Sequence, residues 1–219
     1  MNALHRTRGE AIEGKPRPVP PLGEPAVGEG ARDLSPADAL GLEHDLIRRV
    51  VRVLERQAAR IEEEGQIDPV FLTTIVDFIH TYAGRVHHGK EEEILFRQLD
   101  DKDLSAEHRR MMEELATEHV EMRRAVEELR QAKERYGEGE EAALGVIQDR
   151  LHTLIDLYPD HMKTEDETFF LAAMDYLDDA ERQQVMEQMR GHDRAMIHER
   201  YGAMADDLEA WTEDWTLRG

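Results

Sequence analysis

The sequence contains no cysteine among its 219 residues. Disulfide bonds, thiolate zinc sites, iron–sulfur clusters and cysteine nucleophiles are therefore excluded. Any metal ion that binds must accept nitrogen and oxygen donors only.

Long apolar runs are also missing. No stretch approaches the roughly 20 apolar residues that a membrane-spanning helix needs. The chain begins MNALHRTRGE, which lacks the apolar segment of a secretory signal. We therefore expect no membrane span and a cytoplasmic location.

Basic residues are few, with 28 Lys and Arg against 49 Asp and Glu, for a net charge of −21. This charge repels phosphate backbones and anionic lipid head groups, so we expect no nucleic-acid partner and no membrane partner. It attracts cations, but an acidic composition alone does not predict a metal site.

Alternating Val, Ile and Thr, the pattern of strands, is absent, whereas Leu, Ala, Glu, Arg and Met dominate. We expect an all-α fold: an up-down-up-down four-helix bundle with an additional C-terminal helix and an irregular N-terminal tail. The expected domains are a Pro/Gly-rich tail over 1–34, the bundle over 35–177 and a C-terminal helical extension over 178–219.

Helix boundaries follow from capping signals. Ser35-Pro36, Asp68-Pro69 and Ser105 are typical of helix starts, and Gly65 is typical of a helix end. The sequence Asp178-x-x-Glu181 is typical of a capping box and predicts a fifth helix. The four bundle helices are expected over about 36–64, 69–99, 106–136 and 139–176.

Two short stretches, HHGKEEEILF at 87–96 and HMKTEDETFF at 161–170, each place a Glu four residues after a His. On a helix these two side chains share a face and can reach one metal ion. Composition alone would give about two or three such pairs, so the pattern is weak by itself.

The spacing makes the pattern stronger. The dipeptides Glu43-His44 and Glu118-His119 precede the two stretches, and His44 lies 43 residues before His87 while His119 lies 42 before His161. We interpret the chain as a duplicated helix–loop–helix unit, with a His on its first helix and a His/Glu pair on its second.

His87 and His88 each have a Glu four residues later. An apolar stripe at helical spacing passes through His87 and Glu91, so we expect this pair to face inward, rather than His88 and Glu92. His80 lies one heptad before His87 and is equally compatible with a supporting role or a core role. We expect the remaining histidines to lie at the surface or at helix ends; they are His88, His108, His152, His192 and His198.

The expected inward-facing donors are His44, His87, Glu91, His119, His161 and Glu165. Such a set suits two metal ions bridged by the two glutamates, most favourably iron, with manganese and zinc as alternatives. The alternative without metal is a set of core histidines satisfied by the glutamates. Unpartnered buried carboxylates would each cost several kcal/mol, which favours the metal interpretation.

Residues 38–176 resemble the hemerythrin family in its HHE cation-binding branch. The resemblance lies in Glu43-His44, HHGKEEEILF, Glu118-His119 and HMKTEDETFF. It implies a four-helix bundle with a non-haem di-iron centre that handles O2, NO or peroxide, and the same six ligands.

The sequence differs from known branches of the family in two respects. Oxygen-carrying hemerythrins have two His one turn apart on the third helix, whereas His119 has Leu115 and Arg123 at these positions. The four-His, two-Glu set is more similar to a branch that includes iron-centre repair proteins. Their Cys-bearing N-terminal domain is replaced here by the Pro-rich tail, which argues against repair activity.

The leading hypothesis is a di-iron protein that binds or reacts with O2, NO or peroxide in sensing, scavenging or stress response. A di-iron peroxidase or oxidase is one alternative. Another is a metal-stabilised interaction module, with a protein partner or self-association through the C-terminal helix.

Overall fold

The computed structural model describes residues 34–193 and 197–216. The expected tail therefore lies, except for its last residue, outside the described residues. All regular secondary structure within the two ranges is helical, as the sequence predicts. Within these ranges no helix combines the length and the apolar composition that a membrane crossing requires.

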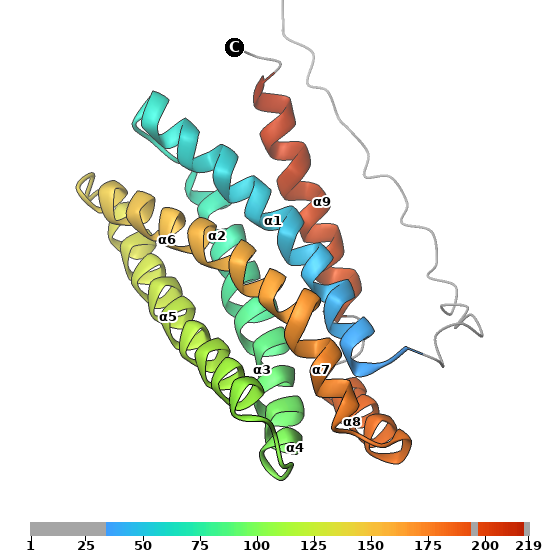
Figure 1. The fold of residues 1–219 in the computed structure, drawn as a ribbon. Coiled ribbons are helices and arrows are strands. Elements are labelled where there is room, and N and C mark those ends of the chain that lie inside the picture. Colours follow the sequence, from blue (N-terminus) through green and yellow to red (C-terminus); the bar gives the residue numbers. More distant parts are fainter. Residues whose placement is uncertain (1–33, 194–196, 217–219) are drawn as a thin grey trace, which may run out of the picture. The chain divides into compact units, whose positions relative to one another are not determined.

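Four long helices run alternately up and down, and two more follow them (Figure 1). The first is α1 (Pro36–Glu64) and the third is α5 (Ala106–Gly137). The second comprises α2 (Pro69–Asp77), η2 (Phe78–His87), α3 (His88–Lys90), η3 (Glu91–Phe96) and α4 (Arg97–Asp100). The fourth comprises α6 (Ala143–Thr164), η4 (Glu165–Phe169) and α7 (Phe170–Asp175), and it is followed by α8 (Asp179–His192) and α9 (Ile197–Thr216).

Capping residues fix the ends of α1. Ser35 and Asp38 form a reciprocal capping box, and Pro36 occupies the first turn, where no backbone N–H is needed. Gly65 ends the helix in the left-handed conformation, at φ 67°. The predicted span of α1 is confirmed.

The elements η2, η3 and η4 are π-helical, with backbone hydrogen bonds to the fifth residue rather than the fourth. A π-helix turns less per residue than an α-helix. Faces predicted from α-helical spacing therefore shift progressively across η2, which ends at His87. This shift decides which histidines of the second helix face inward.

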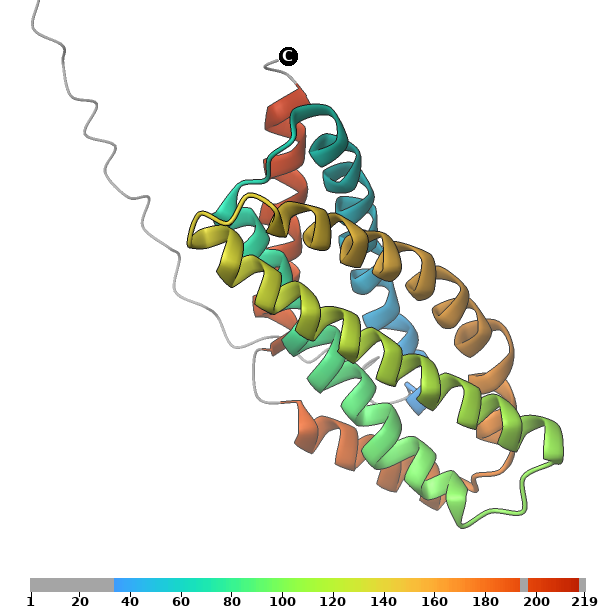
Figure 2. The ribbon, with the colours of Figure 1, turned by 90° about the vertical axis from the view of Figure 1, so that its left-hand side faces the viewer.

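The bundle is closed by contacts between α5 and α6, between α6 and α1, and between α2 and α5, and Figure 2 shows α5 beside the second helix. Helix α9 packs along α1 and also contacts α2. The C-terminal extension contains two helices instead of the single fifth helix expected from the sequence. Helix α8 ends at His192, because Asp193 adopts an extended conformation with ψ 102°.

Two apolar clusters fill the interior. The larger cluster includes Val51, Leu54 and Leu151 and is covered by α9 through residues such as Leu208. The smaller one includes Leu40, Leu95, Leu115, Phe169 and Val185, and therefore involves α8. On each long helix one cluster lies mainly before the predicted ligands and the other after them, so the predicted metal site lies between the clusters; Met162, directly after His161, belongs to the larger one.

Truncating a core leucine should destabilise the bundle far more than truncating a surface leucine. Leu151 is fully buried in the larger cluster, whereas Leu171 is 64% exposed. Leu151→Ala should lower the free energy of unfolding by about 2–5 kcal/mol, and Leu171→Ala by less than about 0.5 kcal/mol. Urea unfolding at matched metal content measures both values. Equal losses would contradict the position of Leu151 in the core.

Candidate metal centre

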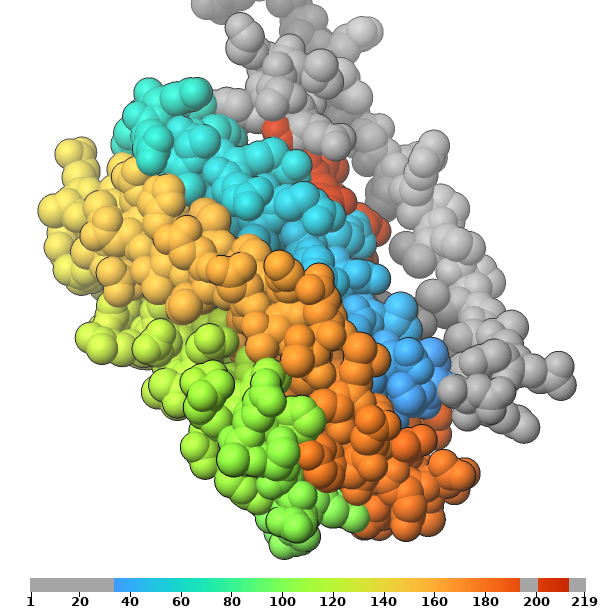
Figure 3. All heavy atoms as spheres, in the orientation of Figure 1, coloured from blue at the N-terminus to red at the C-terminus, as the bar shows by residue number. Residues whose placement is uncertain are grey.

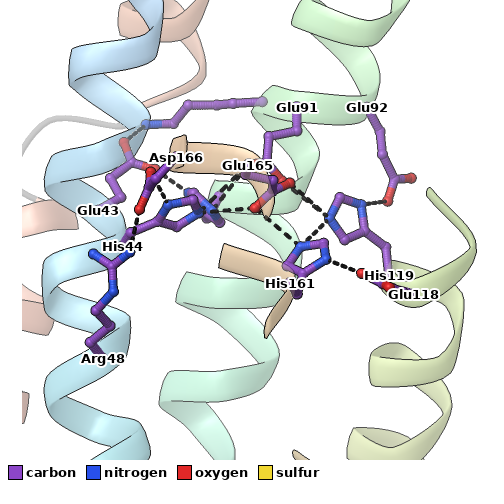
Figure 4. A network of polar contacts seen from close by, with 12 residues as sticks. Glu43, His44, Arg48, Glu91, Glu92, Glu118, His119, His161, Glu165 and Asp166 are labelled. Carbon is purple, nitrogen blue, oxygen red and sulfur yellow. Dashed lines mark hydrogen bonds and ion pairs between the residues drawn. The ribbon is translucent and has the colours of Figure 1, made fainter. Parts of the chain in front are cut away.

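The structure brings all six sequence-predicted ligands into one buried layer between the two apolar clusters. Each of their side chains is at most 2% exposed. The residues come from four helices, and the close view shows the side chains of His44, Glu91, His119, His161 and Glu165 converging (Figure 4). The six residues are His44, His87, Glu91, His119, His161 and Glu165.

Glu91 lies between two groups of histidines. Its Oε1 is 3.2 Å from Nε2 of His87 and 3.9 Å from Nε2 of His44. Its Oε2 is 3.3 Å from Nε2 of His119. A carboxylate that faces imidazoles on both sides has the arrangement that bridging two ions requires.

Glu165 also lies between the two groups of histidines. Its Oε2 is 3.2 Å from Nε2 of His44 and 3.2 Å from Nε2 of His161, and its Oε1 is 3.8 Å from Nε2 of His119. The Nε2 atoms of His119 and His161 are 3.0 Å apart. That the six residues bind metal, with both glutamates bridging, stays a prediction.

Each of the four imidazoles has a carboxylate at its outward-facing Nδ1. Because a carboxylate only accepts, Nδ1–H donates the hydrogen bond and the neutral ring keeps its Nε2 lone pair for the interior. Such a carboxylate–histidine pair is typical of metal ligands, since it fixes the ring and raises its basicity. The pairs are His44–Asp166 at 2.8 Å, His87–Glu43 at 2.9 Å, His119–Glu92 at 2.8 Å and His161–Glu118 at 2.7 Å.

These four carboxylates are not among the functional residues predicted from the sequence. The signal was present, because each one directly precedes or follows a predicted ligand. The pairing crosses between helices: Glu43 is adjacent to His44 but hydrogen-bonds His87, and Glu118 is adjacent to His119 but hydrogen-bonds His161. Helical spacing within one segment could not show these pairs.

Three of these carboxylates also bind a cation on their outer side. Arg48 pairs with Asp166 (Figure 4), Arg123 pairs with Glu92, and Lys90 pairs with Glu43. Lys90 is itself only 1% exposed and also pairs with Asp193 at the end of α8. The C-terminal extension is thus linked to the site through Asp193, Lys90, Glu43 and His87.

His88 does not lie at the surface, as the sequence analysis expected, but is only 1% exposed. Its ring stacks on His119, with centroids 4.0 Å apart and planes at 14°. His80, which α-helical spacing put on the same face as His87, is exposed. The π-helical η2 accounts for both corrections. Because each residue turns by a smaller angle than in an α-helix, His80 and His87 no longer share a face, and His88 is rotated towards the interior.

The other histidines are as expected where they are described. His152 is exposed, and His108 and His192 are partly exposed and near helix ends. The side chain of His198 lies outside the described residues.

Donor atoms from seven residues form two groups, in each of which the atoms lie within 4.8 Å of one another. Glu91 belongs to both groups. One group contains His44, His87, Glu91 and Glu165, and the other contains His88, Glu91, His119 and His161.

Several of these buried atoms have no hydrogen-bond partner in the described part of the chain. They include Nε2 of His44 and of His87 and all four carboxylate oxygens of Glu91 and Glu165. Leaving such atoms unsatisfied costs about 1–3 kcal/mol each, and more when the group is charged. Their number and convergence fit a site built to hold cations.

The protonation of the site reflects its burial. Burial raises the pKa of Glu165 well above its usual value, and the charge of Glu91 adds to the effect. Burial also acts on Glu91, but the charge of His87 and the contact with His119 outweigh it and hold its pKa well below the usual value. Burial lowers the pKa of His87, yet the charge of Glu91 and the hydrogen bond with Glu43 raise it to about 9. A metal ion must displace this proton, so low pH opposes binding.

The outer carboxylates should control metal affinity without contacting the ion. Glu118→Ala removes the acceptor for His161 Nδ1 and should weaken metal binding about 10- to 100-fold. Glu121→Ala, an exposed position one turn later on α5, is the matched control. Competition with a chelator measures both affinities. An unchanged affinity in Glu118→Ala would contradict this role.

Metal should stabilise the fold, since the donors join four helices. An ion that binds only the native chain adds about 4 kcal/mol at a thousandfold excess over its Kd. The apo protein should therefore melt at a clearly lower temperature. The double variant Glu91→Gln/Glu165→Gln should stabilise the apo protein and abolish tight metal binding.

Thermal melts of the holo protein, the apo protein and the double variant at one pH test this expectation. A melting temperature that does not change when the metal is removed would show that the ions are not at the bundle centre.

The comparisons with known proteins agree with this geometry. The family described as Hemerythrin HHE cation binding domain matches residues 35–173 and again residues 110–219. No curated protein and no solved structure matches the chain at a significant level. The first match covers the four long helices and all six predicted ligands. This chain belongs to the hemerythrin HHE cation-binding domain family.

Proposed function

We propose that the protein holds two iron ions in the buried layer and uses them to bind or react with a small ligand, O2, NO or peroxide. The role would be in sensing, scavenging or stress response. One observation carries the proposal: buried imidazole and carboxylate atoms without hydrogen-bond partners converge from four helices, between two apolar clusters.

One ion would be held by His44 and His87 and the other by His119 and His161, with Glu91 and Glu165 between them. Mixed imidazole and carboxylate donors favour iron, with manganese and zinc as alternatives. Iron would supply a redox-active Lewis acid with coordination positions left for a ligand.

The protein's own residues prepare this site. The outer carboxylates hold the four rings, so little ordering is required when metal binds. The two glutamates supply negative charge that offsets the charge of the cations. Apolar side chains on both sides keep water away, and in Figure 3 the atoms of α1 and of α6 and α7 meet without a visible hollow over the layer.

A small pocket beside the layer favours a small ligand. It lies between η2 and α5, has a volume of about 140 Å³ and is lined at its buried end by His88 and Tyr158. Apolar side chains, Ile79, Met122 and Val126, form much of its wall.

Purified protein that is loaded with iron should contain about two iron ions per chain and absorb in the near ultraviolet, unlike the apo protein. Nitric oxide added anaerobically to the ferrous protein should change this spectrum saturably. The matched control is the double variant Glu91→Gln/Glu165→Gln, which should show neither the iron nor the change. One tightly bound zinc ion and no iron would contradict the proposal.

A peroxide assay separates ligand binding from catalysis. Hydrogen peroxide is much smaller than cumene hydroperoxide, which carries a phenyl ring, so access through this pocket should favour hydrogen peroxide. Multiple turnovers with hydrogen peroxide alone would favour a peroxidase, and a single stoichiometric reaction would favour a sensor or scavenger. Equal reactivity towards both peroxides would contradict access through this pocket.

A further inference from the structure

We propose that His88 is a seventh metal ligand, so that the two metal positions are chemically different. One position would have three imidazoles, from His88, His119 and His161, and the other would have two, from His44 and His87. Glu91 and Glu165 would lie between the two positions. This inference rests on the two-metal centre proposed above.

The position of the His88 ring supports this assignment. Its Nδ1 is buried and has no hydrogen-bond partner in the described part of the chain, in contrast to Nδ1 of His44, His87, His119 and His161. A donor atom of His88 lies within 4.8 Å of donor atoms of Glu91, His119 and His161. In each of the four other rings Nδ1 is occupied by a hydrogen bond to a carboxylate. Nδ1 of His88 has no such bond, so we assign it as the atom that binds the ion.

Packing holds the ring in this place. His88 stacks on His119, and its ring centroid is 5.8 Å from that of His161 and 6.2 Å from that of Tyr158. It is the first residue after η2 and lies at the inner end of the small pocket. His88 therefore lies beside the ion at His119 and His161 and separates it from the pocket.

The internal repeat shows that His88 is a feature of one half only. In the repeated unit His87 corresponds to His161, Glu91 to Glu165 and His88 to Met162. Met162 is buried and belongs to the larger apolar cluster. The same position is therefore apolar in one half and carries an unpartnered nitrogen in the other.

Unequal donor sets should give unequal metal preference. Imidazole-rich sites favour zinc and iron over manganese, whereas carboxylate-rich sites accept manganese more readily. The position with three imidazoles should thus be the tighter zinc site.

The substitution His88→Met tests the proposal, because it gives the first half the residue that the second half already has. Apo protein is titrated with Zn²⁺ by calorimetry and in competition with a chelator. The parent chain should bind two ions. His88→Met should bind one ion as the parent does and the other at least about tenfold more weakly. Two ions bound with parental affinities, or an equal loss at both sites, would overturn the proposal.

Two further measurements separate coordination from packing. His88→Phe keeps a ring against His119 but has no donor atom, so it should show the same selective loss. His80→Gln changes an exposed histidine of the same pocket and should leave both zinc affinities unchanged. Circular dichroism checks that each variant is folded.

A measurement on the unsubstituted chain does not depend on the folding of any variant. With nitrogen-15 in the histidines, addition of Zn²⁺ should move the Nδ1 resonance of His88 to the range of a metal-bound nitrogen. An unmoved resonance in protein that holds two zinc ions would exclude His88 as a ligand. Failure of the parent to bind two ions would contradict the proposed function instead.

Discussion

The hydrogen bond between each outward Nδ1 and a carboxylate is the interaction on which the rest of the centre depends. It fixes the ring and directs Nε2 into the bundle, and it does so on all four long helices. Without these bonds four neutral imidazoles in an apolar interior could rotate and present either nitrogen. The result is a buried layer whose inward atoms lack partners, which is costly unless a cation occupies it.

Positively charged side chains bind the outer carboxylates on the side that faces away from the histidines. Arg48, Arg123 and Lys90 each neutralise one of three outer carboxylates, which are Asp166, Glu92 and Glu43. Lys90 is buried between Glu43 and Asp193, and a buried cation requires such partners. This is the point at which the C-terminal extension contributes to the centre as well as to the apolar core.

The internal repeat explains both the symmetry of the layer and its exception. Each half contributes one acid directly before its first His and another directly after its predicted Glu ligand, and these four acids hydrogen-bond the four rings. The halves differ where His88 corresponds to Met162, and this difference lies at the inner end of the small pocket. In the proposed two-metal centre, this nearly symmetric scaffold would give the two ions unequal surroundings.

The helices and the convergence of the six expected donors could be predicted from the sequence, because they depend on local chemistry and on spacing along one chain; that these donors bind metal stays a prediction. Ser35, Gly65 and Asp178 cap helices whatever the packing is, and two copies of one pattern placed His44, His87, His119 and His161 in register. Only the tertiary structure showed the features that depend on contacts between helices or on a change from α-helical to π-helical geometry. The crossed pairs of Glu43 with His87 and Glu118 with His161 form only when the helices are packed together. The inward position of His88 follows from the π-helical turns of η2, which α-helical spacing cannot reveal because it assumes a constant rotation per residue.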